Sequence, residues 1–247
     1  MTDRRWVRDF HPAPQARVRL ICLPHAGGSA STFLPLSADL APAVDVLAIQ
    51  YPGRQDRLRE PCLEDIPQLA RRVFEALRPV AGVTPTALFG HSMGATVAFE
   101  LARLMEAAGT APVRLFASAR LAPSRNRREP VDSLSDQELL AQLRLLGGTD
   151  QGFLLDDDLM SLALPAIRSD YRAVDRYVCT AAEPLRCPVS VLVGDGDAKV
   201  TPMEATAWRE HTRGEFDLST FPGGHFYLAE QRAGVAKLVQ ERLGVLV

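Results

Sequence analysis

Residues 90–94 read Gly-His-Ser-Met-Gly and place Ser92 in the pattern Gly-x-Ser-x-Gly. An apolar run over residues 86–89 predicts a strand before this segment, and apolar residues at steps of three and four over 93–108 predict a helix after it. Such a strand-to-helix turn pushes the serine hydroxyl outward, and the flanking glycines let the two backbones pass close to each other. Ser92 is therefore predicted to be a nucleophile, and the order of strand, turn and helix argues against a chance Gly/Ser turn.

A serine nucleophile needs a base that takes its proton and a third group that orients the base. Where this kind of turn carries the serine, the acid and then the histidine follow it in the chain. Only His211 and His225 lie after Ser92. His211 ends a predicted helix, and a favourable interaction with the helix C-terminus explains it. His225 lies in a glycine-rich loop after the last predicted strand, so we predict that it is the base.

The acid is expected after the strand that precedes this loop. The predicted strand at residues 189–193 runs into the sequence Gly-Asp-Gly-Asp at 194–197, which offers Asp195 and Asp197. An aspartate beside glycines is also a common turn residue, and the one not used as the acid is expected to serve in that way. Spacing alone leaves the choice open.

Two backbone N–H groups are needed to stabilise the oxyanion that forms when the serine attacks a carbonyl. One belongs to Met93, the residue after the nucleophile, and the other to a loop after an early strand. The segment Leu-Pro-His-Ala-Gly-Gly-Ser at residues 23–29 follows such a strand, and Ala26 is the predicted second donor. The alternatives are a merely flexible loop or a phosphate-binding turn, but neither fuller phosphate-loop pattern occurs in the chain.

Short apolar runs alternate with helical patterns from residue 17 onward, which is typical of βα units on a mostly parallel sheet. A weaker edge strand is predicted at residues 5–10, because its charges and two following prolines disfavour pairing. The six main strands are predicted at residues 18–23, 45–50, 86–89, 113–117, 189–193 and 216–221.

One stretch, from about residue 123 to 180, breaks this alternation because it contains no good strand pattern. Capping residues at 133–138 begin a helix, and residues 156–177 carry further helical patterns. The stretch is too small for a large core of its own, so it is predicted to be a helical insertion that lies on the sheet as a lid. The whole chain, residues 1–247, is then a single domain.

Charge and cysteine content exclude several classes of protein. Lys and Arg number 28 against 30 Asp and Glu, and a net charge of −2 gives no general field to hold nucleic acid or an anionic membrane. The four cysteines have no Cys-x-x-Cys spacing, which favours a reduced, cytoplasmic protein. The polar N-terminus and the lack of a long apolar run predict neither secretion nor membrane spanning.

Five segments together resemble the type II thioesterases, the discrete editing thioesterases that accompany modular polyketide synthases and nonribosomal peptide synthetases. The resemblance extends from about residue 17 to 240, and it implies the α/β-hydrolase fold. The Gly-x-Ser-x-Gly pattern alone indicates only a serine hydrolase, whereas the first two segments are far more specific. The segments are Leu-Pro-His-Ala-Gly-Gly at 23–28, Tyr-Pro-Gly-Arg-Gln-Asp-Arg at 51–57, Gly-His-Ser-Met-Gly-Ala at 90–95, Gly-Asp-Gly-Asp at 194–197 and Gly-Gly-His-Phe at 223–226.

The resemblance implies hydrolysis of acyl thioesters held on the phosphopantetheine arm of an acyl or peptidyl carrier protein, with no metal or bound cofactor. It also implies that Asp197, rather than Asp195, is the acid. The implied site consists of Ser92 as nucleophile, His225 as base, Asp197 as acid, and the N–H groups of Ala26 and Met93 as oxyanion donors.

Rival functions are a product-releasing thioesterase, a small-molecule serine esterase, acyl transfer to an acceptor other than water, and a non-catalytic binding protein of the same fold. Two segments have two interpretations each. The charged run at residues 125–128 is interpreted as a solvated surface in preference to a contact with an acidic carrier protein. The segment at 51–54 either lines the site entrance or forms a turn with a structural arginine.

Overall fold

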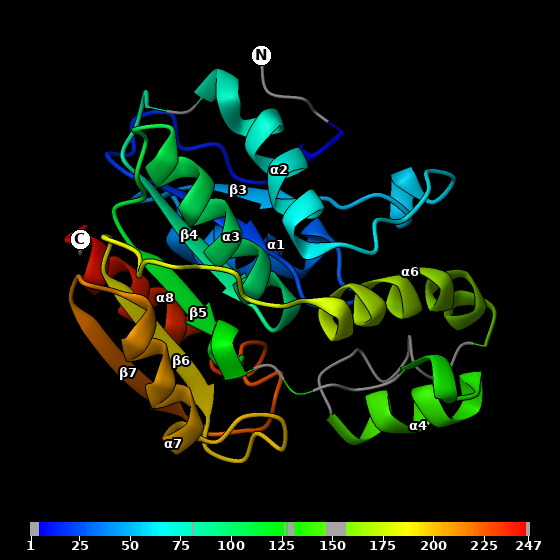
Figure 1. Ribbon diagram of the computed structural model, residues 1–247. Coiled ribbons are helices and arrows are strands. Elements are labelled where there is room, and N and C mark those ends of the chain that lie inside the picture. Colours follow the sequence, from blue (N-terminus) through cyan, green and yellow to red (C-terminus); the bar gives the residue numbers. More distant parts are fainter. Residues whose placement is uncertain (1–4, 81, 126, 128–130, 147–156, 246–247) are drawn as a thin grey trace.

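The computed structural model describes residues 5–80, 82–125, 127, 131–146 and 157–245. Within these residues, seven strands form one sheet in the order β1-β3-β2-β4-β5-β6-β7 (Figure 1). The strands are β1 Val7–Arg8, β2 Arg19–Leu23, β3 Asp45–Ile49, β4 Thr86–His91, β5 Leu115–Ser118, β6 Val189–Gly194 and β7 Phe216–Phe221.

The expected mostly parallel sheet is confirmed. All six main predicted strands form, with ends that differ from the prediction by no more than two residues. β4 is longer than predicted because Gly90 and His91 still pair with β5. The short strand β1 pairs antiparallel with β3, and the other neighbours are parallel. The carboxyl ends of β2, β4, β6 and β7 therefore lie at one edge of the sheet, where ligands bind in open parallel sheets.

Helices cover both faces of this sheet because alternate strand residues point to opposite sides. In β2, Ile21 joins the core beneath α2 and α3, whereas Leu20 joins the core beneath α1 and α8. α3 ends at Ala107, one residue before the predicted end at 108, and the glycine beyond it, Gly109, has φ +75°. The helices on these faces are α1 Leu34–Leu40, α2 Ile66–Leu77, α3 Met93–Ala107 and α8 Arg232–Leu243 (Figure 1).

All regular elements described between β5 and β6 are helical, as expected for residues 123–180. Residues 126, 128–130 and 147–156 lie outside the described residues. The helices have a small core of their own, built around Leu139 and Ile167. That this insertion acts as a lid on a single domain stays a prediction. Its elements are the 3₁₀ helices η4 Pro123–Arg125 and η5 Val131–Ser133, and the helices α4 Asp136–Leu146 and α6 Asp157–Arg176.

Short helices complete the described chain. They lie after β2, β3 and β6 and directly after α2. No helix among the described residues combines the length and the apolar character needed to cross a membrane. These short elements are the helix α7 Pro202–Ala205 and the 3₁₀ helices η1 Ala30–Phe33, η2 Gln55–Arg57, η3 Arg78–Val80 and η6 Thr206–His211.

Candidate active site

Ser92 lies in the turn between β4 and α3 with φ 54° and ψ −119°, a conformation that non-glycine residues rarely adopt. Both flanking glycines are required by close backbone packing. A Cβ atom on Gly90 would lie 2.2 Å from the Gly94 carbonyl oxygen, and one on Gly94 would lie 2.0 Å from the carbonyl oxygen of Leu23 in β2. The strained turn and the close packing of α3 against β4 and the end of β2 therefore depend on the Gly-x-Ser-x-Gly sequence itself.

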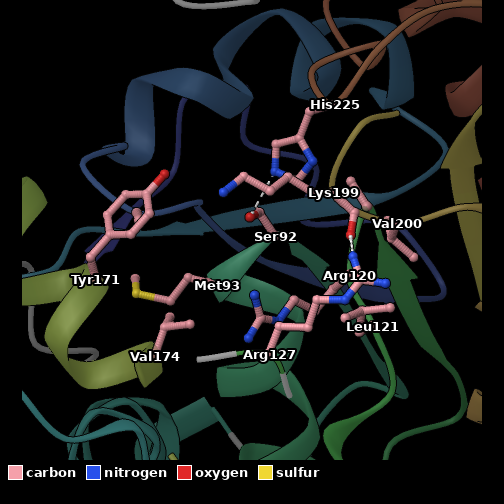
Figure 2. A pocket seen from close by; sticks show the side chains of 12 residues that line it. Ser92, Met93, Arg120, Leu121, Arg127, Tyr171, Val174, Lys199, Val200 and His225 are labelled. Carbon is pink, nitrogen blue, oxygen red and sulfur yellow. Dashed lines mark hydrogen bonds between the residues drawn. The ribbon is translucent and has the colours of Figure 1, made fainter. Parts of the chain in front are cut away.

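His225 and Asp197 join Ser92 in one hydrogen-bonded series, of which Figure 2 shows the contact between Ser92 and His225. The Nε2 atom of His225 lies 2.9 Å from Ser92 Oγ, and its Nδ1 atom lies 2.9 Å and 3.1 Å from the two carboxylate oxygens of Asp197. The Asp197 carboxylate also accepts the Lys199 N–H at 2.7 Å. His225 and Asp197 are each 5% exposed, so the series lies below the protein surface.

Asp195 contacts a backbone N–H group, whereas Asp197 contacts His225. The Asp195 Oδ1 accepts the backbone N–H of Gly223 at 3.0 Å. The loop after β6 is also joined to the next loop by the Gly196 N–H, which donates to the Gly223 carbonyl at 2.9 Å. Asp195 thus holds the loop that carries His225, which matches the turn role expected for the aspartate that does not contact the histidine.

The two predicted oxyanion donors lie on either side of Ser92. Ala26 follows β2 and Met93 begins α3, and both line the pocket that contains Ser92 and His225. Among the described residues, neither the Ala26 N–H nor the Met93 N–H donates a hydrogen bond. Both donors therefore remain available to an oxygen atom bound beside Ser92.

Two further histidines lie behind the site in a tight ring cluster. His25 and His91 have ring centroids 5.9 Å apart, and His91 is 5.6 Å from His225. Burial, followed by the nearby His225, lowers the pKa of His25 to about 3 and holds the pKa of His91 well below its ordinary value. His91 Nδ1 lies 2.8 Å from Ser118 Oγ, which is 2.7 Å from the Tyr227 hydroxyl. Both rings are therefore neutral near pH 7.

The pocket above Ser92 has one wall from the helical insertion and a basic side (Figure 2). Tyr171 and Val174 of α6 form the first, and Arg120, Arg127 and Lys199 form the second. Sequence reasoning singled out neither α6 residue, because no local motif marks them. It interpreted Arg127 as part of a solvated surface. The side chain is 55% exposed and paired with Glu204, but it also lines this pocket.

His211 does not belong to the site, as predicted, but the reason given for its position is wrong. It ends the 3₁₀ helix η6 and packs against Phe99 and Trp208, and its Nε2 lies 2.8 Å from Ser124 Oγ. A helix C-terminus favours the charged imidazolium, whereas burial here lowers the pKa of His211 and favours the neutral ring. Packing and one hydrogen bond therefore explain this residue.

The structure also decides between the two interpretations of the segment at 51–54, a lining of the site entrance or a turn with a structural arginine. Arg54 is 6% exposed and pairs with Asp170 of α6, so it is a structural arginine. It is absent from the residues that line the pocket. Among the described residues, no group of three or more His, Cys, Asp or Glu side chains is arranged to hold a metal ion.

Comparison with known proteins identifies the relatives of this chain. The model of the thioesterase domain family matches residues 18–243. The chain is 48% identical over 251 residues to thioesterase PikA5 of Streptomyces venezuelae, across 98% of this chain and 89% of that protein. The structure of BorB, a type II thioesterase from the borrelidin biosynthetic cluster, has 54% identity and a TM-score of 0.91 and covers 98% of this chain and 99% of its own. YbtT, a type II thioesterase from the yersiniabactin NRPS/PKS pathway, has 31% identity and a TM-score of 0.87, with 97% and 98% covered.

Proposed function

This chain belongs to the thioesterase family, and from that premise we propose that it is a type II thioesterase of a polyketide or nonribosomal peptide pathway. Its substrate is an acyl group held as a thioester on the phosphopantetheine arm of a carrier protein. Its role is to clear stalled or wrongly primed carriers. The names of PikA5, BorB and YbtT support the reaction class, and the pathways named for BorB and YbtT support the setting.

The observation that carries the proposal is the hydrogen-bonded series from Ser92 through His225 to Asp197 at the base of the pocket. His225 Nε2 takes the hydroxyl proton while Ser92 Oγ forms a bond to the thioester carbonyl carbon. Asp197 accepts the Nδ1–H of His225, which keeps Nε2 free to act as the base and stabilises the imidazolium that forms.

Attack turns the carbonyl oxygen into an oxyanion, and we expect the N–H groups of Ala26 and Met93 to receive it. When the carbon–sulfur bond breaks, His225 returns the proton to the pantetheine sulfur, and an acyl ester remains on Ser92. His225 then takes a proton from water, the resulting hydroxide attacks the ester, and the acid leaves as the proton returns to Ser92 Oγ. Each oxyanion donor in such a site contributes roughly 3 kcal/mol to lowering the barrier.

The helical insertion forms one wall of the pocket beside Ser92, through Tyr171 and Val174 of α6. A repair enzyme must accept short acyl groups and reject a growing intermediate. We propose that the narrow space beneath α6 gives this preference and that a long chain needs the α6 wall to move.

Mass spectrometry of carrier proteins loaded with acetyl, propionyl, hexanoyl and decanoyl groups tests substrate class and chain length together. We expect fast release of the two short groups. Ser92→Ala should abolish release, whereas Ser31→Ala, which removes an exposed hydroxyl outside the site, should not change it. Full hydrolysis by Ser92→Ala would reject the mechanism and point to another active residue, whereas no hydrolysis by the wild-type protein would leave a non-catalytic binding protein.

The remaining alternatives differ in what the same assay releases. A small-molecule esterase would cleave the matching oxygen ester or free pantetheine thioester as fast as the acyl carrier. A product-releasing thioesterase would prefer the long chains, and an acyltransferase would need an added acceptor. The described part of the chain holds its four cysteines as free thiols, which supports a reducing compartment such as the cytoplasm, where we propose that the reaction occurs.

A further inference from the structure

A buried ion pair joins the helical insertion to the loop that follows β3. Arg54 Nη1 and Nη2 donate to the two carboxylate oxygens of Asp170 at 2.9 Å and 3.0 Å. The Arg54 and Asp170 side chains are only 7% and 1% exposed. Asp170 belongs to α6, whereas Arg54 belongs to the loop after β3, so the pair fixes the insertion to the core of the molecule.

Both members of this pair also hold the loop that carries Ala26. Asp170 Oδ2 accepts the backbone N–H of Gly27 at 2.7 Å, and Arg54 Nη1 donates to the Gly28 carbonyl at 3.2 Å. The peptide unit between Ala26 and Gly27 is planar, so holding the Gly27 N–H fixes the orientation of that plane. The torsion at Ala26, and with it the direction of the Ala26 N–H, is then restricted.

Helix α6 also packs directly against this loop. Gly27 has φ +74°, and a Cβ atom there would lie 2.5 Å from the Ile167 side chain of α6. The loop therefore needs both a glycine and a seated α6 to keep its shape. One turn further along α6, Tyr171 and Val174 line the pocket beside Ser92 (Figure 2). The same helix thus shapes the substrate wall and holds the oxyanion loop.

We propose that Arg54 and Asp170 are positioning residues for the oxyanion hole, so that the Ala26 donor is aligned only while α6 of the insertion is seated on the loop. This inference rests on the proposed Ser92 mechanism. It couples the state of the insertion to the chemical step, since any displacement of α6 that breaks the contact with Gly27 releases the loop. The effect falls on transition-state stabilisation and not on substrate binding.

The electrostatics of the pair support a fixed geometry. Burial by itself lowers the pKa of Arg54, but the Asp170 carboxylate outweighs it and raises that pKa above its ordinary value. The guanidinium also lies 5.2 Å from the centre of the Tyr51 ring. An arginine–carboxylate pair with two parallel hydrogen bonds restricts orientation as well as distance, which a single contact does not.

Three variants test the proposal. Asp170→Asn removes the charge, Arg54→Lys keeps the charge but loses the two-pronged contact, and the double variant Arg54→Met with Asp170→Leu removes the pair and the acceptor for Gly27. A buried pair replaced by apolar groups of similar volume usually leaves the fold intact, so the double variant protects the test against misfolding. The matched control is Glu64→Gln, because Glu64 pairs with Arg172 of α6 at 2.9 Å without touching the oxyanion loop.

Two readouts separate a positioning role from a structural one. The first is kcat and KM for propionyl release from a carrier protein. The second is the inhibition constant of a trifluoromethyl ketone analogue of propionyl-pantetheine, which bonds to Ser92 Oγ and places a negative oxygen in the oxyanion hole. We expect the double variant to lose roughly 10–10³-fold in kcat with KM changed less than about threefold, and the inhibitor to weaken in parallel. Arg54→Lys should show an intermediate loss.

Two further variants, Glu64→Gln as the control and Ser92→Ala as the nucleophile variant, show which of the two proposals a result contradicts. Glu64→Gln should keep both values within about twofold of wild type, as a partly exposed pair contributes little. A folded double variant with wild-type kcat and wild-type inhibitor affinity would overturn the positioning role while Ser92→Ala remains inactive. Hydrolysis by Ser92→Ala would instead overturn the proposed function itself. Should the double variant fail to fold, Arg54→Lys and Asp170→Asn decide by the same two readouts.

Discussion

The proposed nucleophile and the proposed second oxyanion donor are held by two unequal parts of the molecule. Ser92, His225 and Asp197 lie at the ends of β4, β7 and β6, over a core that both helical layers bury. Ala26 lies after β2, but its loop is fixed by α6 of the insertion. Among its described residues, the insertion has a small core of five buried residues besides its contacts with the rest of the chain.

The difference separates two requirements of the proposed reaction. Proton transfer from Ser92 to His225 would need a constant distance between the two side chains, which the loops at the end of the central sheet supply. The proposed oxyanion hole and the substrate wall would have to admit and release an acyl chain on a long arm, and they depend on the insertion, whose core is smaller. A change in the insertion is therefore expected to alter barrier height and chain-length preference before it alters the Ser92–His225 contact.

The largest expected effect comes from the close packing of α3 against the end of β2, next to Ser92. In Gly94→Ala, the new Cβ would lie 2.0 Å from the Leu23 carbonyl oxygen, which belongs to the backbone and cannot turn aside. We expect a loss of several kcal/mol in the free energy of unfolding or no folded protein, measured by thermal denaturation. Gly109→Ala is the control, since nothing lies within 4 Å of its Cβ position and only its φ of +75° opposes the change. That variant should lose about 1 kcal/mol.

A folded Gly94→Ala with a melting temperature like that of Gly109→Ala would contradict the view that the sheet holds the nucleophile turn rigidly. The central sheet would then not be the more rigid of the two parts.

The next effect concerns the acid. Asp197→Asn is expected to lower kcat roughly 10⁴-fold, because the amide donates toward His225 Nδ1 and favours the wrong tautomer of the ring. Asp195→Asn keeps an oxygen that can accept the Gly223 N–H, so its loss should stay below about tenfold. Rates of propionyl release at saturating substrate measure both. Equal losses in the two variants would mean that Asp197 is no more important than the loop contact made by Asp195.

Much of this arrangement follows from local sequence, and the exceptions share one physical cause. The strands and the turn at Ser92 are encoded by short apolar runs and by the local Gly-x-Ser-x-Gly pattern. The contact of Arg54 with Asp170 joins residues 116 positions apart, and neither carries a motif that indicates the other. Asp170 was not among the predicted residues at all.

The positions of single side chains on the insertion were equally beyond sequence reasoning. Arg127 and Tyr171 reach the pocket because of how the insertion is seated, and its helical pattern does not encode that placement. His211 shows the converse, since its sequence position suggested a favoured cation and tertiary burial made the neutral ring the stable form.

A smaller effect is expected from the insertion core. Leu139 of α4 is fully buried in the small cluster with Ile167. Leu139→Ala should cost about 2–5 kcal/mol of local stability, seen as faster amide hydrogen exchange across α4 and α6. Leu101→Ala, in the main core on α3, should instead lower protection throughout the sheet. Uniform loss of protection in Leu139→Ala would show that the insertion and the central sheet unfold as one unit. It would contradict the view that the two parts differ in stability.

The smallest effect is expected between β4 and the loop that carries Ala26, at the buried pair His25 and His91. Burial lowers both pKa values below the ordinary 6.5, so between pH 6.5 and 5 the unfolded chain binds protons that the folded chain does not. Stability is therefore fully present above pH 6.5 and falls as the pH falls, by no more than about 2 kcal/mol per histidine down to pH 5. Urea denaturation at pH 7 and pH 5 should show a smaller decrease for His91→Asn, whose amide still reaches Ser118, than for wild type. Equal decreases would mean that His91 gains its proton as easily in the folded state, and that the joint between β4 and the oxyanion loop is open to water.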